Sequence, residues 1–373
     1  MLKIEVARTW GAVPAAEWDA LVGDKSPFLE HTFLRGVEDS GAAVPDTGWD
    51  PRPVLVRDDA GKLVGGASCW LKTHSMGEFV YDFGWADAAH RAGIPYYPKL
   101  IVAVPFSPVT GDRILAVDDA AREAVLAGIV EAGKAARGVH VLFPSESEAA
   151  WLVSRGLFPR IQHQFWWRNH DYTSWEHFIE GFASKDRNKL RRERKECTNL
   201  RIDSYLGPDR AVIDQMYDFY VSTTSKHSYG HAYLTRELFR WLGDRWGDRL
   251  HVVVARDGDT IVAGSLNVQK GDRLYGRYWG CKGDEKFVHF EVCYHQAIDW
   301  CIANGLKVFE PGHGGDHKFK RGFLPEVTYS AHALAHPGLN KGLAEWSKRE
   351  AEAVHADVKS LREASPLKVK PPT

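Results

Sequence analysis

Hydrophobic positions in the first half of the chain switch between the two-residue period of β-strands and the wider spacing of amphipathic helices. The runs at 52–57 and 62–70 alternate and flank a short Asp- and Gly-containing link, which favours a hairpin. Helical spacing recurs at 120–138 and at 146–155. Residues 71–111 show no clean period, and long irregular stretches inside compact domains are usually functional. This half is therefore predicted to alternate strands and helices around a sheet.

The second half repeats this order of elements with a clearer pattern. Three strand-like runs, separated by glycine-containing turns, predict a β-meander over 249–280. Apolar residues at helical spacing predict a helix over 288–304, and a short strand is expected at 307–310. A charged helix is predicted over 339–362.

The chain length indicates more than one hydrophobic core. A chain of 373 residues suits two domains rather than one. We therefore expect an α/β fold with one domain at 1–165, a second at 166–336, and a C-terminal helix and tail at 337–373.

Composition and charge narrow the classes of protein. The net charge of −1 gives no overall attraction for nucleic acids or membranes, so any such contact must come from a local patch. The five cysteines form no CxxC pair, which suits reduced cytosolic thiols better than a disulfide framework. No signal-peptide core and no run of 18 apolar residues occur, so we expect a cytoplasmic protein without a membrane span.

Reactive side chains concentrate between residues 273 and 323. His289 and Glu291 stand where the predicted helix begins, and the helix dipole there favours negative charge. Glu291 therefore suits a base or an amine anchor better than an acid. The segment also carries Cys293, His295, Glu310, His313, His317, Lys318 and Lys320.

This cluster has three interpretations: a metal site, a polar substrate cleft, or plain structural hydrogen bonding. Glu291 and His295 are helical neighbours, and His313 and His317 bracket a tight loop, but neither H-x-x-x-H nor H-E-x-x-H occurs on the helix. We therefore expect no metal and favour the substrate cleft.

Nucleophilic catalysis is a further alternative. No GxSxG sequence, P-loop or glycine-rich dinucleotide turn is present, and no cysteine has a histidine beside it in a triad-like pattern. Cys281 and Cys293 stay open as acyl-carrying nucleophiles.

The segment 185–195 is strongly basic, with seven Lys or Arg and two acids. Such a helix is either a solvated surface or a phosphate-binding surface for a polyanion such as a tRNA acceptor arm. No aromatic platform for bases interleaves with it, so sequence-specific reading is not indicated. The candidate nucleic-acid-binding residues are Lys185, Arg187, Lys189, Arg191 and Arg192.

Two polar and aromatic groups are candidates for substrate binding. The cations around Phe319 form either a solvated turn or a site for an oxyanion or a donor phosphate. The polar residues after position 72 either cap an aromatic core or grip a polar acceptor. The candidate substrate-binding residues are His74, Glu78, Tyr81, Asp82, Tyr97, Lys99, Arg277, Trp279, Glu310, His317, Lys318 and Arg321.

Several motifs carry a resemblance to a known family. The stretch 187–192 (RNKLRR) looks like the R-x-N-I-R-K helix of Fem-type aminoacyl transferases, and 319–323 (FKRGF) matches their F-K-x-G-F motif. Over about residues 3–336 the chain resembles the bacterial Fem-like GNAT subfamily labelled peptidoglycan biosynthesis/recognition. The stretches that look like hallmarks of that subfamily are 74–82, 96–100, 105–111, 276–281 and 289–291.

This resemblance implies two tandem GNAT-like domains with a shared cleft and a C-terminal helix. It implies a transferase in which an acceptor amine (an amino acid, a peptide or a precursor) attacks an activated acyl ester or thioester directly. The first domain would bind the acceptor and the second the donor. Lys320 would stabilise the oxyanion, with Glu291 and His289 as the other catalytic candidates.

The resemblance leaves the acyl donor open between aminoacyl-tRNA and acyl-CoA, used as co-substrates, and we expect no bound cofactor. An acyl-CoA loop usually reads Q/R-x-x-G-x-G/A, whereas the corresponding stretch 281–286 has one glycine and two acids. We therefore favour aminoacyl-tRNA. The alternatives are an acyl-CoA-dependent N-acyltransferase on a small amine, a non-catalytic module that binds a peptide or a peptidoglycan precursor, and a metal-dependent hydrolase.

Overall fold

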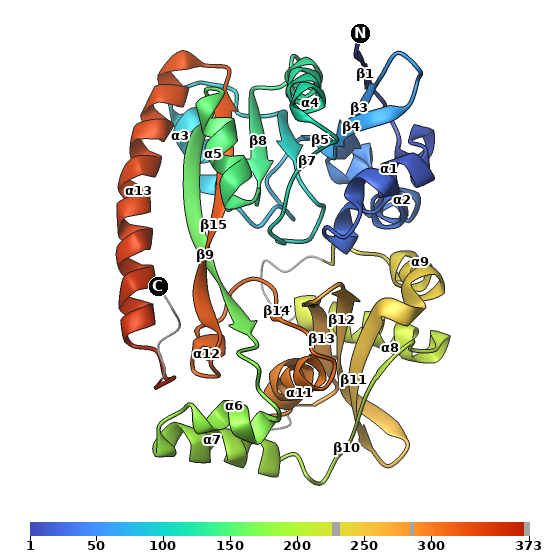
Figure 1. Cartoon of the computed structure of the whole chain (residues 1–373), viewed down its shortest axis with the longest axis vertical. Helices are drawn as coiled ribbons and strands as arrows, with labels where there is room; N and C mark the ends of the chain where they lie inside the picture. Colours follow the sequence, from blue (N-terminus) through green and yellow to red (C-terminus); the bar gives the residue numbers. More distant parts are fainter. Residues whose placement is uncertain (226–231, 284–286, 369–373) are drawn as a thin grey trace. The chain divides into compact units, whose positions relative to one another are not determined.

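The computed structural model describes residues 1–225, 232–283 and 287–368 (Figure 1). The chain divides into two compact units, and the first is discontinuous in sequence. Within the described residues, none of the helices combines the length and the apolar character needed to span a bilayer.

Unit 1 consists of Met1–Gln162 together with Val327–Ala356. Its helices are α1 (Ala15–Val22), α2 (His31–Asp39), α3 (Phe83–Arg91), α4 (Asp119–Ala132) and α5 (Glu146–Ser154), with 3₁₀ turns at Trp10–Ala12, Pro27–Leu29 and Pro45–Thr47. Its strands are β1 (Lys3–Val6), β2 (Trp49–Pro51), β3 (Val54–Arg57), β4 (Leu63–Ala67), β5 (Cys69–Lys72), β6 (Lys99–Val102), β7 (Ile114–Ala116) and β8 (Gly138–Leu142).

Unit 2 consists of His163–Glu326 together with the chain from Asp357 onward. Its helices are α6 (Trp175–Glu180), α7 (Ser184–Lys195), α8 (Arg210–Ser225), α9 (Arg236–Trp246), α10 (Val288–Phe290), a π-helix (Glu291–His295), α11 (Gln296–Ala303) and α12 (Asp316–Phe319), with a 3₁₀ turn at Gly247–Arg249. Its strands are β10 (Arg201–Leu206), β11 (Leu250–Asp257), β12 (Thr260–Lys270), β13 (Arg273–Cys281) and β14 (Val308–Glu310). The dividing points fall within β9 (Phe158–Arg168), β15 (Leu324–Leu334) and α13 (Pro337–Glu363).

Strand β15 explains why the expected domain ranges differ from the units. Its residues Ser330–Leu334 pair antiparallel with Leu142–Gly138 of β8, so the chain returns to unit 1 after Glu326. The first part of α13 also belongs to unit 1, so 337–373 does not form a separate C-terminal element.

Unit 1 contains two groups of paired strands. One sheet has the order β1-β3-β4-β7, and the predicted hairpin is confirmed as the antiparallel pair β3–β4. The other strands follow the order β15-β8-β6-β5-β2. The stretch 71–111, expected to be irregular, contains α3 and the fully buried strand β6. Its strand lacks a period of two because both faces of β6 are covered.

Unit 2 is built on strands in the order β10-β11-β12-β13-β14-β9. The predicted meander is confirmed, since β11, β12 and β13 pair antiparallel in succession. A Cβ at Gly264 would meet Met216 of α8, whereas the next residue, Ser265, donates to the carbonyl of Val292 in the π-helix. Because adjacent strand residues face opposite sides, α8 and the π-helix cover opposite faces of β12.

The predicted helix 288–304 is interrupted. Its middle turn, Glu291–His295, is a π-helix rather than an α-helix, and such single turns are frequent at functional sites. The expected core stripe is confirmed: Tyr294, Ala297, Ile298 and Cys301 are buried in the core of unit 2, and Phe290 packs against it.

Substituting Gly280 of β13 should test the packing of α8 on this sheet. An alanine Cβ there would lie 2.3 Å from the carbonyl oxygen of Phe219, which is backbone of α8 and cannot rotate away. We expect Gly280→Ala to lower the free energy of unfolding by about 1–3 kcal/mol, measured by urea denaturation. Gly247→Ala is the matched control, because nothing lies within 4 Å of its Cβ. Equal stability of the two variants would contradict this packing.

Candidate functional site

The candidate site in unit 2 begins where β13 and β14 separate. The two strands pair in parallel from Arg273 and Val308 to Tyr275 and Glu310, where β14 ends. Immediately beyond, β13 has a bulge: Gly276 and Tyr278 pair with neighbouring residues of β12, which leaves Arg277 as the extra residue. Bulges are common next to active sites because they redirect a side chain.

Trp279 and His289 meet just beyond this bulge. Their rings are stacked with centroids 4.1 Å apart, and His289 also makes ring contacts with Tyr294 and His317 at 5.4 Å. The hydroxyl of Tyr294 lies 2.9 Å from Nε2 of His317. The structure therefore brings together His289, Trp279 and His317, three residues singled out from the sequence.

The side chain of Lys318 hydrogen-bonds back to the glycine-rich loop that follows β14. Its Nζ donates to the carbonyl oxygens of Gly312 at 2.7 Å and His313 at 3.3 Å, and the residue is 3% exposed. Gly312, like Gly314 and Gly315, has a positive φ, a conformation that favours glycine. Lys318 is thus a buried ammonium whose hydrogen-bond acceptors in the described structure are neutral carbonyls.

Burial and positive neighbours govern the protonation of this cluster. Burial lowers the pKa of Lys318 to about 7, and Arg277 contributes. Burial also lowers the pKa of His289 to about 3, reinforced by His317, Arg321 and Lys318. Burial and Lys318 lower the pKa of His313 to about 4. The histidines are therefore neutral near pH 7, and the cations Lys318 and Arg277 suit an anionic group or a developing oxyanion.

Arg321 connects this region to α7. Its Nε and Nη2 donate to the two carboxylate oxygens of Glu193 at 2.9 and 2.6 Å, and its Nη1 donates to the carbonyl of His317 at 2.7 Å. The guanidinium lies over the ring of Phe290, 3.2 Å from the centroid.

Two other predicted residues pair elsewhere in unit 2. Glu291 accepts from Gln296 at 2.6 Å and lies 3.3 Å from Arg194, and it lines a pocket of about 300 Å³ beside α7 and β10. Glu310 accepts from Arg273 at 2.7 Å. Glu291 thus contacts Arg194 and Gln296, and its expected role as a base or an amine anchor stays a prediction.

Lys320 lies at the surface, although the F-K-x-G-F motif falls on it. It caps the short helix α12 and is exposed, whereas Lys318, two residues earlier, is buried. The catalytic role expected for Lys320 stays a prediction, and Lys318 is the lysine that lies within the cluster.

The substrate-binding residues predicted in the first half lie close together in unit 1. The fully buried Nζ of Lys99 donates to Glu78 at 2.7 Å, to Ser75 at 2.9 Å and to Asp82. The hydroxyl of Tyr97 lies 2.7 Å from Oγ of Ser75. The cluster is an ion-pair network inside the unit.

The charges of this network are strongly coupled. Burial raises the pKa of Glu78 to about 7. Burial also opposes ionisation of Asp82 and Lys99, but their mutual attraction outweighs it, so the pKa of Asp82 is lowered and that of Lys99 is raised. Lys99 and Asp82 therefore form the charged centre.

Two predicted residues near the network, Tyr81 and His74, are less buried than its charged members. Tyr81 is exposed and has a φ of 50°. His74 is half-buried, with Nε2 3.0 Å from the carbonyl of Thr47 and Nδ1 3.3 Å from Lys72. Tyr81 is the member of the predicted set that a ligand reaches most easily.

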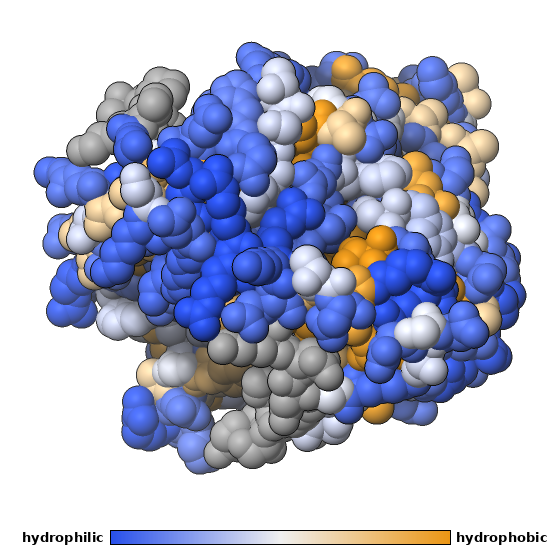
Figure 2. All heavy atoms as spheres, turned by 90° about the horizontal axis from the view of Figure 1, so that it is seen from below, coloured by the Kyte–Doolittle hydropathy of each residue, from blue (hydrophilic) through white to orange (hydrophobic). Residues whose placement is uncertain are grey.

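The basic helix α7 presents part of its charge to solvent. Lys185, Lys189, Arg191 and Arg192 are exposed and Arg187 is half-buried. Arg191 pairs with Glu176 at 2.6 Å, and Arg192 lies 3.3 Å from Glu196. Figure 2 looks from the side on which α6 and α7 lie in Figure 1, and hydrophilic residues predominate in this view.

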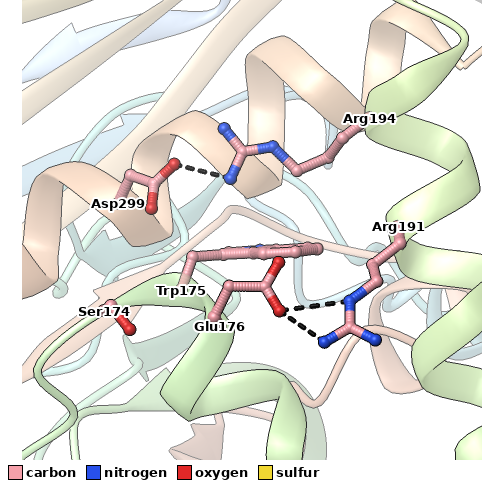
Figure 3. Close-up of a pocket in the computed structure, with 6 residues that line it drawn as sticks. All are labelled: Ser174, Trp175, Glu176, Arg191, Arg194 and Asp299. Atoms are coloured by element: carbon pink, nitrogen blue, oxygen red, sulfur yellow. Dashed lines mark hydrogen bonds and ion pairs between the residues drawn. The ribbon is translucent and has the colours of Figure 1, made fainter.

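A pocket of about 510 Å³ lies beside α7 (Figure 3). The indole of Trp175 separates Arg194 from the pair formed by Arg191 and Glu176. Arg194 lies 4.7 Å from the Trp175 ring and 2.8 Å from Asp299. Each arginine of the pocket already has a carboxylate partner.

The structure also bears on the two alternatives of a cysteine nucleophile and a metal site. Burial raises the pKa of the Cys293 thiol well above its usual value, which disfavours the reactive thiolate. Cys281 is buried and its thiol lies 2.9 Å from the carbonyl of Gly283. Among the described residues, no group of three or more His, Cys, Asp or Glu side chains is placed to hold a metal ion. The stretch 281–286 lies partly outside the described residues.

Sequence reasoning missed Tyr294 and Glu193, and it named Lys72 only among the polar residues of the first half. Tyr294 was assigned to the core stripe, and its ring is buried there, but its hydroxyl reaches His317. The composition of 185–195 marks Glu193 only as one of two acids in a basic helix. Its place on the helix face that carries Leu190, three residues earlier, was the available signal. Lys72 is fully buried over the ring of Trp49 at 3.8 Å, and it ends a strand.

Comparisons with known proteins give a family and a fold. The model of the FemAB-like family, described as peptidoglycan biosynthesis/recognition, matches residues 9–369. A search of curated proteins finds no match.

Several solved structures are similar to this chain. FemX covers 92% of this chain and 100% of its own, with 12% identity and a TM-score of 0.53. The C-terminal domain of a putative lysylphosphatidylglycerol synthetase from Agrobacterium fabrum covers 90% and 95%, with 10% identity and a TM-score of 0.53. A conserved protein of unknown function from Bacteroides thetaiotaomicron covers 89% and 99%, with 11% identity and a TM-score of 0.51. At 10–12% identity this likeness concerns the fold alone, and it confirms the expected α/β fold, whose C-terminal helix is α13.

The protonation of His289 provides a test of the cluster. With a pKa of about 3, its imidazole should stay neutral from pH 8 to pH 5 in ¹⁵N NMR spectra. Lys318→Met removes a cation that lowers this pKa, so the titration of His289 should move to higher pH. Lys320→Met is the matched control, since it removes an exposed lysine, and should leave the titration unchanged. A wild-type titration in Lys318→Met would show that Lys318 does not act on His289.

Proposed function

The chain belongs to the FemAB-like family of peptidoglycan biosynthesis/recognition proteins, and on that premise we propose that it is an N-acyltransferase whose chemistry takes place in unit 2. An acceptor amine attacks the carbonyl carbon of an activated acyl ester or thioester. The C–N bond forms as the bond to the leaving oxygen or sulfur breaks, without a covalent enzyme intermediate. The burial of Cys281 and the raised pKa of Cys293 agree with direct attack.

One observation carries this proposal: Lys318 is buried beside Arg277 and is held by carbonyl oxygens. A tetrahedral intermediate of acyl transfer places negative charge on the former carbonyl oxygen. A positioned cation in a site with little water stabilises that charge strongly. Burial is the main cause of the low pKa of the neighbouring histidines, and the nearby cations that add to it would be compensated when an anionic group enters.

The proton released by the attacking amine needs an acceptor. His289 is neutral near pH 7, because burial and the nearby cations keep its pKa low. With a pKa of about 3 the resting imidazole is a weak base, and the negative charge developing on a neighbouring oxyanion would raise that pKa as the amine attacks. Trp279, stacked on one side, fixes the ring. We assign this role to His289, with His317 and Tyr294 holding its other side. Glu291, the other catalytic candidate, contacts Arg194 and would accept the proton from that position.

We propose aminoacyl-tRNA as the donor. The support comes from the exposed lysines and arginines of α7, which suit contact with phosphates, and from the fold shared with FemX. Acyl-CoA is the competing donor. The acceptor is assigned to unit 1, as the family resemblance implied, with Tyr81 as the exposed contact. The buried Lys99 network would hold the segment that carries Tyr81.

The direct experiment is a transfer assay with purified protein. Charged tRNAs and a panel of acyl-CoAs are each incubated with candidate amines, and products are detected by mass spectrometry. Loss of labelled aminoacyl-tRNA only in the presence of an acceptor supports the proposal. Transfer from acyl-CoA alone would replace the donor, and ligand binding without turnover from any donor would favour the non-catalytic alternative.

The two lysines of the HKFK sequence separate the roles within the site. Lys318→Met is expected to lower kcat by about 10²–10³-fold, because an oxyanion-stabilising group is lost. Lys320→Met is expected to change kcat little, since that side chain is exposed. The reverse result would assign the catalytic cation to Lys320, as the family motif implied.

The pH dependence follows from the pKa of Lys318. Its pKa of about 7 means that the protonated, oxyanion-stabilising form is lost as pH rises through about 7. We expect kcat to carry a falling alkaline limb from this loss, and we expect that limb to be absent from the residual activity of Lys318→Met. A falling limb that persists unchanged in Lys318→Met would assign it to another group.

A further inference from the structure

The buried carboxylate of Glu193 is the centre of a contact chain that reaches the candidate site from α7. Glu193 and Arg321 are 1% and 4% exposed, and two parallel hydrogen bonds join them. Such a fork fixes the plane of the guanidinium as well as its distance. Glu193 therefore determines where Arg321 points.

Because Glu193 fixes Arg321, the other contacts of Arg321 are fixed too. These are made by its remaining N–H groups and by the face of its guanidinium plane. Its Nη1 donates to the carbonyl of His317 at 2.7 Å, and its face covers Phe290. The imidazole attached to that fixed backbone lies 2.9 Å from the hydroxyl of Tyr294 and 5.4 Å from the ring of His289. Any rotation of Arg321 would release the His317 carbonyl.

Glu193 is itself fixed from its other side. His295 of the π-helix lies with Nε2 3.1 Å from Oε2 of Glu193, and the indole of Trp175 packs edge-on against His295 at 5.4 Å. Burial opposes ionisation of Glu193, but His295 and Arg321 outweigh it and lower its pKa. Two residues, Arg321 and His295, therefore hold the carboxylate in one place, and Trp175 supports His295.

We propose that Glu193 is a positioning residue of the candidate site, acting through Arg321 on the backbone and imidazole of His317. The predicted effect on kcat rests on the proposed function, whereas the predicted effect on the NMR signal of His317 does not. A buried ion pair that served stability alone could be replaced by apolar residues without consequence for His317. The position of His317 therefore distinguishes a positioning role of Glu193 from a purely stabilising one.

The test compares three variants of the whole chain with the wild type. Glu193→Gln removes the charge and keeps the size of the side chain. The double variant Glu193→Met with Arg321→Met removes both charges, so no uncompensated charge is left buried and the fold is kept. Glu196→Gln is the matched control, because Glu196 caps the C-terminal end of the same helix but is exposed and paired with Arg192.

Three readouts are measured for each variant: the midpoint of thermal unfolding, the ¹⁵N NMR signal of the His317 imidazole, and kcat and KM with the donor found in the transfer assay. The His317 signal is assigned by its absence in His317→Gln. Because Arg321 is also a candidate for substrate binding, the His317 signal decides the positioning role.

For Glu193→Gln we expect a lower unfolding midpoint, a displaced His317 signal, and a kcat reduced by about 100-fold, the cost of a small misplacement. In the double variant the unfolding midpoint should return close to that of the wild type, while the His317 signal stays displaced. Glu196→Gln should match the wild type in every readout. A double variant with the wild-type His317 signal, or a Glu193→Gln variant with an unmoved signal, would overturn the proposal. If no donor supports transfer in the wild type, the proposed function fails, and the His317 signal still decides the role of Glu193.

Discussion

The short parallel pairing of β13 with β14 is the constraint on which the arrangement of unit 2 depends. It ends at Tyr275 and Glu310, after which β13 continues beside β12 and β14 turns into a glycine-rich loop. The separation leaves room for side chains from three segments: Arg277 from the bulge, His289 from the start of the interrupted helix, and Lys318 from the loop. In open α/β sheets, ligands bind outside the carboxyl ends of strands, and this site follows that rule.

Burial, rather than charge alone, distinguishes the residues of the site from their neighbours in sequence. Lys318 and Lys320 belong to the same short stretch, yet one is buried against carbonyl oxygens and the other is in water. The same distinction applies to α7 and its C-cap, where Glu193 is buried and Glu196 is exposed. Removing an ammonium or a carboxylate from water raises the strength of its interactions and the cost of leaving it unpaired. The candidate site therefore contains fewer residues than the full set of charged residues in this part of the chain.

Sequence patterns predicted the local elements of unit 2 well, because its meander and its apolar stripe have clear periods. They also brought His289 and His317 together, since both flank the same short strand. They missed the π-helix, because one extra residue per turn hardly alters a pattern of apolar spacing. They assigned 327–336 to the wrong unit, because strand pairing between distant segments leaves no local signal. The preference for Lys320 over Lys318 came from a motif, and a motif does not report which of two lysines is buried.

The return of β15 to unit 1 has a consequence for the order in which the protein is made. The rings of His140 and His332, which meet with Nδ1 atoms 2.8 Å apart, are separated by 192 residues of chain. A ribosome therefore synthesises the segment that forms unit 2 before it delivers the strand that completes unit 1 beside β8. Until then β8 offers an unpaired edge, the kind of surface on which other chains can pair. Contacts of such long range also slow folding, so unit 1, although its synthesis begins first, is completed only after His163–Glu326, the main segment of unit 2, has been made.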